Sequence, residues 1–392
     1  MRSKLRLICL SPQFLIFSLW TFLLFSFQVH ADDSSKYMQA GYDYGDAPAS
    51  YASKPKHQVL AFKHTNGTTA LDHYTTTNGS QTDQGAYTMH QTDSGSIFIG
   101  GRFSKFNGTA VNSPKLAKLN SSTFQEQGTF LTSAPNNDVT ALASYRLPNS
   151  TTEYLIVGGR FTNIGGQARN RLAIINLATN QVLAWNANLA STVHSIAVDK
   201  ERAILHVGGD FGYYQYSLAN LASNPSTITP SQSHTTGRVF SIYLDRNSQQ
   251  VFIGGTFSNF LNSGKQYFAV LDANTQSVLP NAPSANGVVY SISSRLGNRA
   301  YLIGDFTTLG NYNRAGLAAI DLPSLTVNDV WNPGHTWSNK SSDPGQSTAD
   351  GDGDGLGGTR YGLVAAHILY ADNFDVIVAR SGMQSYAGST IS

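Results

Sequence analysis

The chain has very little cysteine and few charges. Its single cysteine among 392 residues is Cys9, close to the N-terminus. The rest of the chain can therefore form no disulfide bond within itself and has no thiol chemistry. Asp, Glu, Lys and Arg make up only 13% of the residues, about half the share of an ordinary soluble domain. There is no basic run or basic face, so nucleic acid and anionic membranes are not expected as partners.

Long apolar stretches are missing beyond the first 31 residues. This N-terminal segment has three basic residues in its first six positions and an apolar run over 14–27. It ends in Val29-His30-Ala31, whose first and last residues are small residues at the two positions that a signal peptidase reads. We expect residues 1–31 to be a cleaved signal peptide, which places the protein outside the cell or on its surface with no transmembrane segment. An uncleaved N-terminal anchor is the alternative. Cleavage would leave 23 of the 26 basic residues against 24 acidic ones, a net charge of −1.

Linear signatures of catalysis are also missing. We find no His-Glu-x-x-His, no histidine pair with zinc spacing and no glycine-rich segment that precedes a helix. Asp93-Ser94-Gly95 resembles a serine-protease loop, but it stands before an apolar strand and is expected to be a turn. His194 and His206 alternate with apolar residues, so we expect them to be packed or edge histidines rather than metal ligands. No catalytic and no cofactor-binding residue is predicted.

Glycine and aromatic residues are abundant instead. The chain has 36 Gly, and its 19 Tyr and 20 Phe suit the turns and pleated surfaces of a strand-rich fold. Five segments share an apolar run that is closed by glycine and followed by Phe. Their phenylalanines are Phe103, Phe161, Phe211, Phe257 and Phe306, with gaps of 58, 50, 46 and 49 residues. Each segment predicts a buried strand that ends abruptly.

A second motif keeps a constant distance from the first. Val193-His194-Ser195-Ile196, Val239-Phe240-Ser241-Ile242 and Val289-Tyr290-Ser291-Ile292 precede their Phe by 18, 18 and 17 residues, and 86–89 and 139–142 are looser copies. Further apolar runs follow the glycines, which makes four short strands in each unit of about 50 residues. This arithmetic is typical of a propeller blade, and we interpret the repeated Gly, Phe, Val and Ser-Ile positions as scaffold.

We therefore predict an all-β fold, a β-propeller of six four-stranded blades over residues 57–392, with a loop insertion at about 334–360. Residues 32–56 form a separate N-terminal segment. The sixth copy is degenerate and runs from Val364 to Gly382, and we expect the strand His57–Phe62 to complete it and close the ring. The alternative is that the chain is a fragment of a longer repeat array.

The repeat also resembles a known family. The segment from Gly158-Gly159-Arg160-Phe161 to Arg171-Leu172-Ala173 is similar to the delta-60 repeat propellers of bacterial exported and surface proteins, and to the fungal cortical polarity-marker proteins. This resemblance covers roughly residues 86–392. It implies a propeller at or outside the cell surface and brings no catalytic residues. The short segment 43–51 resembles an opening motif of repeat-bearing bacterial surface proteins.

One segment has the pattern of a calcium loop. Asp350, Asp352 and Asp354 alternate with glycines, which suits a hard cation such as Ca²⁺. The pattern departs at Gly358 and Tyr361, where such loops place the last ligands. A solvated Asp/Gly linker is the other interpretation.

These observations predict function only broadly. The main hypothesis is a non-catalytic binding, adhesion or scaffold module whose partner is an extracellular protein or glycan. The alternative is a propeller enzyme whose active-site residues converge at the central axis from several blades. A passive structural domain is a third interpretation. Tyr213, Tyr214 and Tyr216 could form a binding cluster on a loop, or they could cap a shorter blade.

Overall fold

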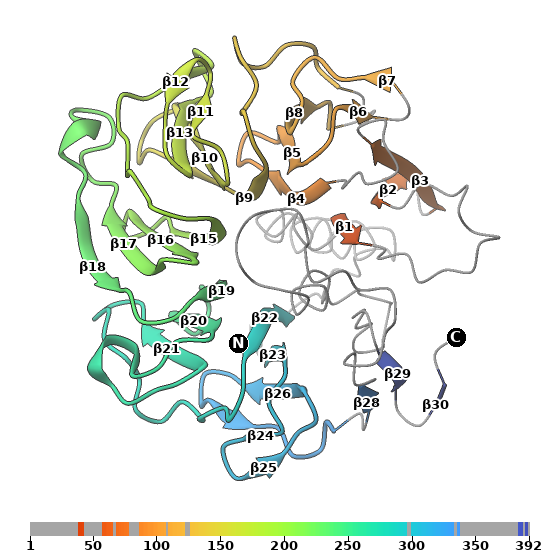
Figure 1. The fold of residues 1–392 in the computed structure, drawn as a ribbon, viewed down its shortest axis with the longest axis vertical. Helices are drawn as coiled ribbons and strands as arrows, with labels where there is room; N and C mark the ends of the chain where they lie inside the picture. The colour runs from red at the N-terminus through yellow and green to blue at the C-terminus, as the bar shows by residue number, and fades with distance from the viewer. Residues whose placement is uncertain are drawn as a thin grey trace, which may run out of the picture.

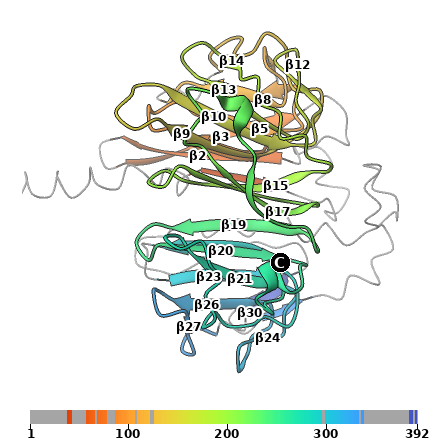
Figure 2. The ribbon, with the colours of Figure 1, turned by 90° about the vertical axis from the view of Figure 1, so that its left-hand side faces the viewer.

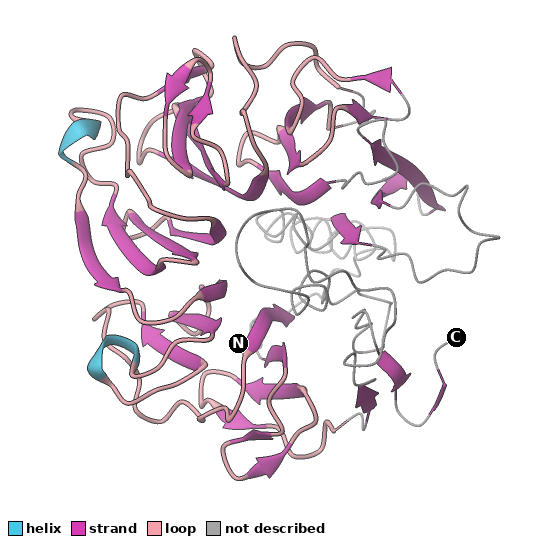
Figure 3. Ribbon diagram, in the orientation of Figure 1, coloured by secondary structure: helices cyan, strands magenta, loops and turns pink. Residues whose placement is uncertain are grey.

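The computed structural model describes residues 38–42, 57–65, 68–77, 86–106, 109–121, 126–295, 299–332, 335–337, 383–386 and 389–390. In these ranges almost all regular structure is antiparallel sheet (Figure 3). The helices described there are two short 3₁₀ turns, η3 (Pro225–Thr227) and η4 (Phe260–Asn262). The all-β class is thus confirmed. Within the same ranges no helix has the length and hydropathy needed to cross a membrane.

Each of the five clear repeats forms one antiparallel sheet of three or four strands. In chain order the strands of these sheets are β4 (Ala86–Gln91), β5 (Ile97–Gly101) and β8 (Leu116–Leu119); β9 (Val139–Arg146), β10 (Glu153–Gly159), β13 (Leu172–Asn176) and β14 (Gln181–Val182); β15 (Val193–Asp199), β16 (Ile204–Gly209), β17 (Gly212–Ser217) and β18 (Pro230–His234); β19 (Val239–Asp245), β20 (Gln250–Gly255) and β21 (Phe268–Asp272); and β22 (Val289–Arg295), β23 (Arg299–Gly304), β26 (Leu317–Asp321) and β27 (Thr326–Val327).

The five sheets follow one another around a common centre (Figure 1). The first strand of each sheet, β4, β9, β15, β19 or β22, lies innermost, and each of these inner strands contacts the next in chain order. In the side view the sheets are stacked as successive layers (Figure 2). The described part of the chain is therefore β-propeller-like.

The hydrophobic core lies between neighbouring sheets rather than within one of them. Phe98 of the first sheet belongs to the same buried cluster as Leu155 of the second, and Tyr213 of the third belongs with Val251 and Phe257 of the fourth. A sheet that is covered on both faces needs strands that are buried and largely apolar along their length, and every residue of β5 and β10 is buried. Each repeat is stabilised mainly by its neighbours.

The repeated phenylalanine is buried in four of the five sheets, as expected for scaffold. Phe103, Phe161, Phe257 and Phe306 are all at most 1% exposed. Phe211 differs and is only half-buried. Gly209 pairs directly with Gly212, so Asp210 and Phe211 form a tight two-residue turn between β16 and β17. In this repeat Tyr213, rather than Phe211, lies in the buried cluster with residues of the fourth sheet.

Short hairpins follow the glycine segment in three repeats, and further strands lie near both ends of the chain. They are β6 (Lys105–Phe106) with β7 (Thr109–Ala110), β11 (Asn163–Ile164) with β12 (Gln167–Ala168), β24 (Thr308–Leu309) with β25 (Tyr312–Asn313), then β1 (Met38–Tyr42), β2 (His57–Thr65) and β3 (Thr68–Thr77), and finally β28 (His335–Trp337), β29 (Met383–Tyr386) and β30 (Ser389–Thr390).

The strand predicted at His57–Phe62 is confirmed as part of β2. Its partners in the described ranges are β1 and β3, and β1 lies beside the inner strand β4. Val364 and Gly382, on which the sixth copy depends, lie outside the described residues. Completion of a sixth sheet by this strand therefore stays a prediction.

Candidate functional site at the bulged ends of the inner strands

Every inner strand contains a β-bulge at the same place. In the third sheet Val193 pairs with Gly209 and Ser195 with Gly208, so that His194 is the extra residue. The same register shift occurs opposite the glycine segment in the other four sheets. We call the five extra residues the axial bulge residues: Tyr87, Thr140, His194, Phe240 and Tyr290.

The first glycine of the segment receives a valine from the next repeat. A Cβ added to Gly158 would lie 2.5 Å from Cγ1 of Val193, and one added to Gly208 would lie 2.4 Å from Cγ1 of Val239. Any larger residue would force the two sheets apart. This contact places each inner strand against the sheet of the preceding repeat. The constant distance between the two sequence motifs has another cause, because within one repeat the valine pairs with a glycine of the same hairpin, as Val193 does with Gly209.

The second glycine shapes the bulge itself. A Cβ on Gly159 would lie 2.0 Å from the carbonyl oxygen of Asp138, the residue before the valine position. That carbonyl accepts a hydrogen bond of 2.8 Å from the backbone N–H of Arg160. Close backbone approach of this kind is a common reason for glycine within a strand.

The repeated serine joins one inner strand to the next. Ser195 Oγ accepts a 2.9 Å hydrogen bond from the backbone N–H of Ile242, and Ser241 Oγ accepts one of 3.0 Å from Ile292. An innermost strand has a neighbouring strand of its sheet on one side only. Its N–H groups on the other side need a different acceptor, and the serine hydroxyl provides one. The scaffold interpretation of Val-x-Ser-Ile is therefore supported by its contacts.

The residue between these scaffold positions behaves differently. Val193, Val239 and Val289 are fully buried, whereas all five axial bulge residues are half-buried. Their chemistry also varies from one repeat to the next, from a phenol to a hydroxyl, an imidazole and a phenyl ring. The bulges therefore present five side chains of four different types at one end of the inner strands.

Three of these side chains form a row of rings across three successive repeats. The ring centroids of His194 and Phe240 are 5.5 Å apart, and those of Phe240 and Tyr290 are 5.8 Å apart. The planes are tilted by 57° and 48° rather than stacked. His194 Nε2 lies 2.8 Å from Oδ1 of Asp210, and the Tyr290 hydroxyl donates a hydrogen bond to Asp305.

Charged residues flank the bulges and form ion pairs between neighbouring repeats. Arg102 follows the glycines of the first repeat and lies 2.7 Å from Asp138, which precedes the valine position of the second. Asp210 and Arg238 occupy the equivalent places in the third and fourth repeats with the charges exchanged, 3.5 Å apart. With Arg160 and Asp305 after the glycines of the second and fifth repeats, these positions hold three cations and three anions.

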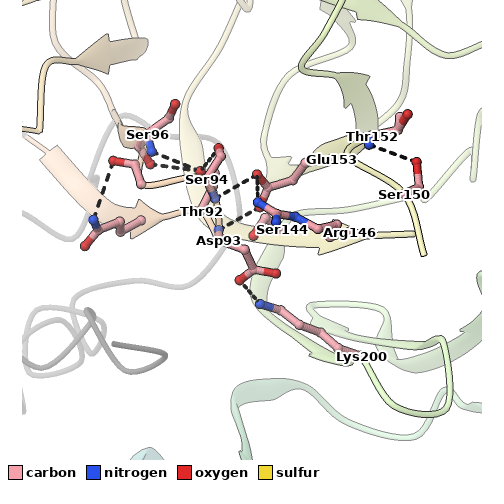
Figure 4. A network of polar contacts seen from close by, with 12 residues as sticks. Thr92, Asp93, Ser94, Ser96, Ser144, Arg146, Ser150, Thr152, Glu153 and Lys200 are labelled. Carbon is pink, nitrogen blue, oxygen red and sulfur yellow. Dashed lines mark hydrogen bonds and ion pairs between the residues drawn. The ribbon is translucent and has the colours of Figure 1, made fainter. Parts of the chain in front are cut away.

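The opposite end of the inner strands carries a polar network that is centred on the buried Glu153 (Figure 4). Glu153, 3% exposed, accepts hydrogen bonds of 2.7 and 3.1 Å from the backbone N–H groups of Asp93 and Ser94. Burial raises the pKa of the Glu153 carboxyl, but these hydrogen bonds outweigh that effect and hold its pKa below the usual value. Lys200 of the third repeat forms an ion pair with Asp93. This network links three repeats and is structural.

Two further histidines lie away from the axial bulge residues: His90 is half-buried and His206 is fully buried. His90 Nε2 lies 2.9 Å from Ser144 Oγ, and burial together with Lys200 lowers the pKa of His90 to about 4. His206 Nδ1 lies 2.7 Å from the Tyr213 hydroxyl, which donates to Gln215, while His206 Nε2 is buried without a partner. Burial lowers the pKa of His206 to about 4, because the cation would need an acceptor at Nε2.

The sequence-derived candidates fare differently. Asp93-Ser94-Gly95 is a turn between β4 and β5, and His206 is packed, as predicted. His194 lies on β15, an edge strand of its sheet, in agreement with the second form of the prediction, and it is the bulge residue paired with Asp210. Tyr213, Tyr214 and Tyr216 lie on strand β17 rather than on a loop, with Tyr213 and Tyr216 buried.

The predicted calcium ligands Asp350, Asp352 and Asp354 lie outside the described residues. Among the residues that are described, no group of three or more His, Cys, Asp or Glu side chains is placed to hold a metal ion. Sequence reasoning did not single out Tyr87, Thr140, Phe240 or Tyr290 as a site. The available signal was the variable position within an otherwise repeated motif.

Comparison with known proteins adds little to this picture. No family model matches the chain, and no curated protein matches it significantly. Among the solved structures that it resembles is a chain of the crystal structure of a mitotic checkpoint complex. That match has a TM-score of 0.44 and 12% identity, and it covers 69% of this chain and 72% of the other. A similarity of this size says nothing about function.

Proposed function

We propose that this protein is a non-catalytic extracellular binding module that takes its ligand, an extracellular protein or glycan, at the axial bulge residues. One observation carries the proposal: the same register shift in five sheets brings one variable, half-buried side chain per repeat to one end of the inner strands. A rigid scaffold with variable residues at one end is a common arrangement for recognition.

An enzymatic role is the second candidate, because the 2.8 Å contact between His194 and Asp210 is a possible proton-transfer pair. However, Asp210 also contacts Arg238. Beyond His194 the row continues with the ring of Phe240, followed by the ring of Tyr290. This composition favours contact with a ligand over activation of a nucleophile.

The test uses the chain without its signal segment, residues 32–392, and sensors coated with neoglycoproteins, mucin, fibronectin and collagen. We expect saturable binding to at least one surface and a loss of about tenfold in affinity in the combined variant Phe240→Ala/Tyr290→Ala. Tyr312→Ala is the matched control, because Tyr312 is an exposed aromatic residue, 39% accessible, on the outer hairpin β24–β25.

Binding that the combined variant leaves unchanged would contradict the location of the site. Turnover of a broad panel of hydrolase and dehydrogenase substrates that His194→Ala abolishes would contradict the non-catalytic role and establish the enzymatic one.

We also propose that the ring is closed as a six-bladed propeller with help from the N-terminal strands. The contact between β1 and β4 supports a role for these strands beside the first repeat. Deletion of residues 32–62 should then lower the melting temperature sharply, whereas an unchanged melting temperature would contradict closure.

A further inference from the structure

The row of rings has an apolar member at its centre. Phe240 lies between His194 and Tyr290, is half-buried, and has no polar atom of its own to interact with water. Its tilt of 48° or more to both neighbours means that neither of them lies flat over its face. A half-buried phenyl ring with polar side chains beside it can pack against an apolar face of a ligand.

Polar groups flank this ring on both sides around the axis. Asp210 and Asp305 follow the glycines of the third and fifth repeats, while Phe240 belongs to the fourth. Asp210 is held by His194 and Arg238, and Asp305 by the Tyr290 hydroxyl. Carboxylates that are fixed by neighbours are good acceptors for ligand hydroxyl groups, because their orientation is set before binding.

The charge at this end of the inner strands indicates a neutral ligand. The positions that flank the bulges hold Arg102, Arg160 and Arg238 against Asp138, Asp210 and Asp305. Two of the cations are within 3.5 Å of two of these acids. A polyanion or a polycation would meet like charges as well as opposite ones, so neither gains much from the field of the site.

We infer that the axial bulge residues of the third to fifth repeats bind a neutral sugar residue of a glycan. The apolar face of the pyranose packs on the Phe240 ring, and hydroxyl groups at its edge donate to Asp305 and Asp210 and accept from Arg238. This inference rests on the proposed binding function and names the ligand class for the same site.

The experiment titrates residues 32–392 with the methyl glycosides of glucose, galactose, mannose and N-acetylglucosamine, followed by ligand-observed NMR. A heparin oligosaccharide and an oligolysine peptide serve as polyanionic and polycationic probes. We expect saturable binding of at least one neutral glycoside and no stronger binding of either charged probe.

Variants then locate the sugar. Phe240→Ala should weaken glycoside binding about tenfold, whereas Phe240→Tyr, which keeps the ring, should stay within about threefold of the wild type. Asp305→Asn, an exposed and nearly isosteric change, should weaken binding about threefold to tenfold. Tyr312→Ala should have no effect.

The outcomes separate the sugar inference from the binding function. Glycoside binding that is insensitive to both Phe240→Ala and Asp305→Asn would overturn the inference. If no glycoside binds but the fibronectin or collagen surface does, with a loss in Phe240→Ala/Tyr290→Ala, the sugar inference fails and the binding function stands. If neither the glycosides nor the coated surfaces bind, both proposals fail.

Discussion

The side chain of Val193, in the third repeat, occupies the space that a side chain at Gly158, in the second repeat, would need. Its Cγ1 atom lies 2.5 Å from the position of a Cβ added to Gly158. The same pairing joins Gly100 to Val139, Gly208 to Val239 and Gly254 to Val289. The series stops in the fifth repeat, where Ile303 occupies the position of the first glycine. Four of the inter-repeat contacts are thus built from the same two residue types.

Gly158→Ala should destabilise the protein by about 1–3 kcal/mol, because the added methyl group overlaps Val193 and also Ile196 Cδ1 at 2.8 Å. Urea unfolding of the single and double variants measures this cost. In Gly158→Ala/Val193→Ala the loss should be smaller than the sum of the single losses, since the clash is relieved.

Gly166→Ala is the control for this glycine. No atom lies within 4 Å of an added Cβ there, but φ is +75°, so only the cost of the backbone conformation, about 1 kcal/mol, is expected. Additive losses in the Gly158 and Val193 variants would contradict direct packing between the two residues.

Ser241→Ala should cost about 1–2 kcal/mol in unfolding free energy. The change removes the acceptor for the backbone N–H of Ile292, a residue that is only 6% exposed, and leaves that donor without its partner. Ser133→Ala, on an exposed loop, is the matched control and should be nearly neutral. A loss in Ser241→Ala no larger than that of the control would show that the serine does not hold the inner strands together.

Stability should fall as the pH falls from about 6.5 to about 4. Burial lowers the pKa of His206 to about 4 in the folded protein, whereas in the unfolded chain its pKa is near 6.5, the ordinary value for histidine. The unfolded state therefore binds more protons in this window, and acid favours unfolding. For His206 alone the loss between pH 7 and pH 5 is about 2 kcal/mol.

His206→Asn tests this pH dependence. The Asn amide can still donate to the Tyr213 hydroxyl but does not titrate. The variant should therefore be less stable than the wild type at pH 7. Its loss of unfolding free energy between pH 7 and pH 5 should be smaller by about 2 kcal/mol. His90 should contribute a similar dependence, which the variant retains. An unchanged pH dependence would mean that His206 is not buried as a neutral group.

Calcium should stabilise the protein if the Asp/Gly segment is a metal loop, as its sequence predicts. A melt of residues 32–392 in EDTA and then in increasing Ca²⁺ should show a saturable rise in melting temperature. Asp352→Ala and Asp354→Ala should abolish that rise. A melt that is indifferent to Ca²⁺ would favour a solvated linker.

The repeated residues were predictable from the sequence because they perform local, recurring tasks. An apolar run closed by glycine specifies a strand that is covered on both faces, and its recurrence specifies sheets that pack on one another. The all-β class, the buried phenylalanines and the turn at Asp93-Ser94-Gly95 all follow from such short patterns. Phe211 is the exception, because Gly212 lets the chain reverse at once and leaves the ring at the tip of a turn.

The candidate site was decided by the tertiary structure. Residues 87, 140, 194, 240 and 290 are of four different types and about 50 residues apart, so no linear motif joins them. A bulge in each inner strand and the packing of successive sheets bring them to one end of the strands. The sequence by itself determined which residues build the repeat, because the same residue types recur at the same positions in successive repeats. Only the fold decided which residues lie together, because that depends on pairing register and on contacts between repeats.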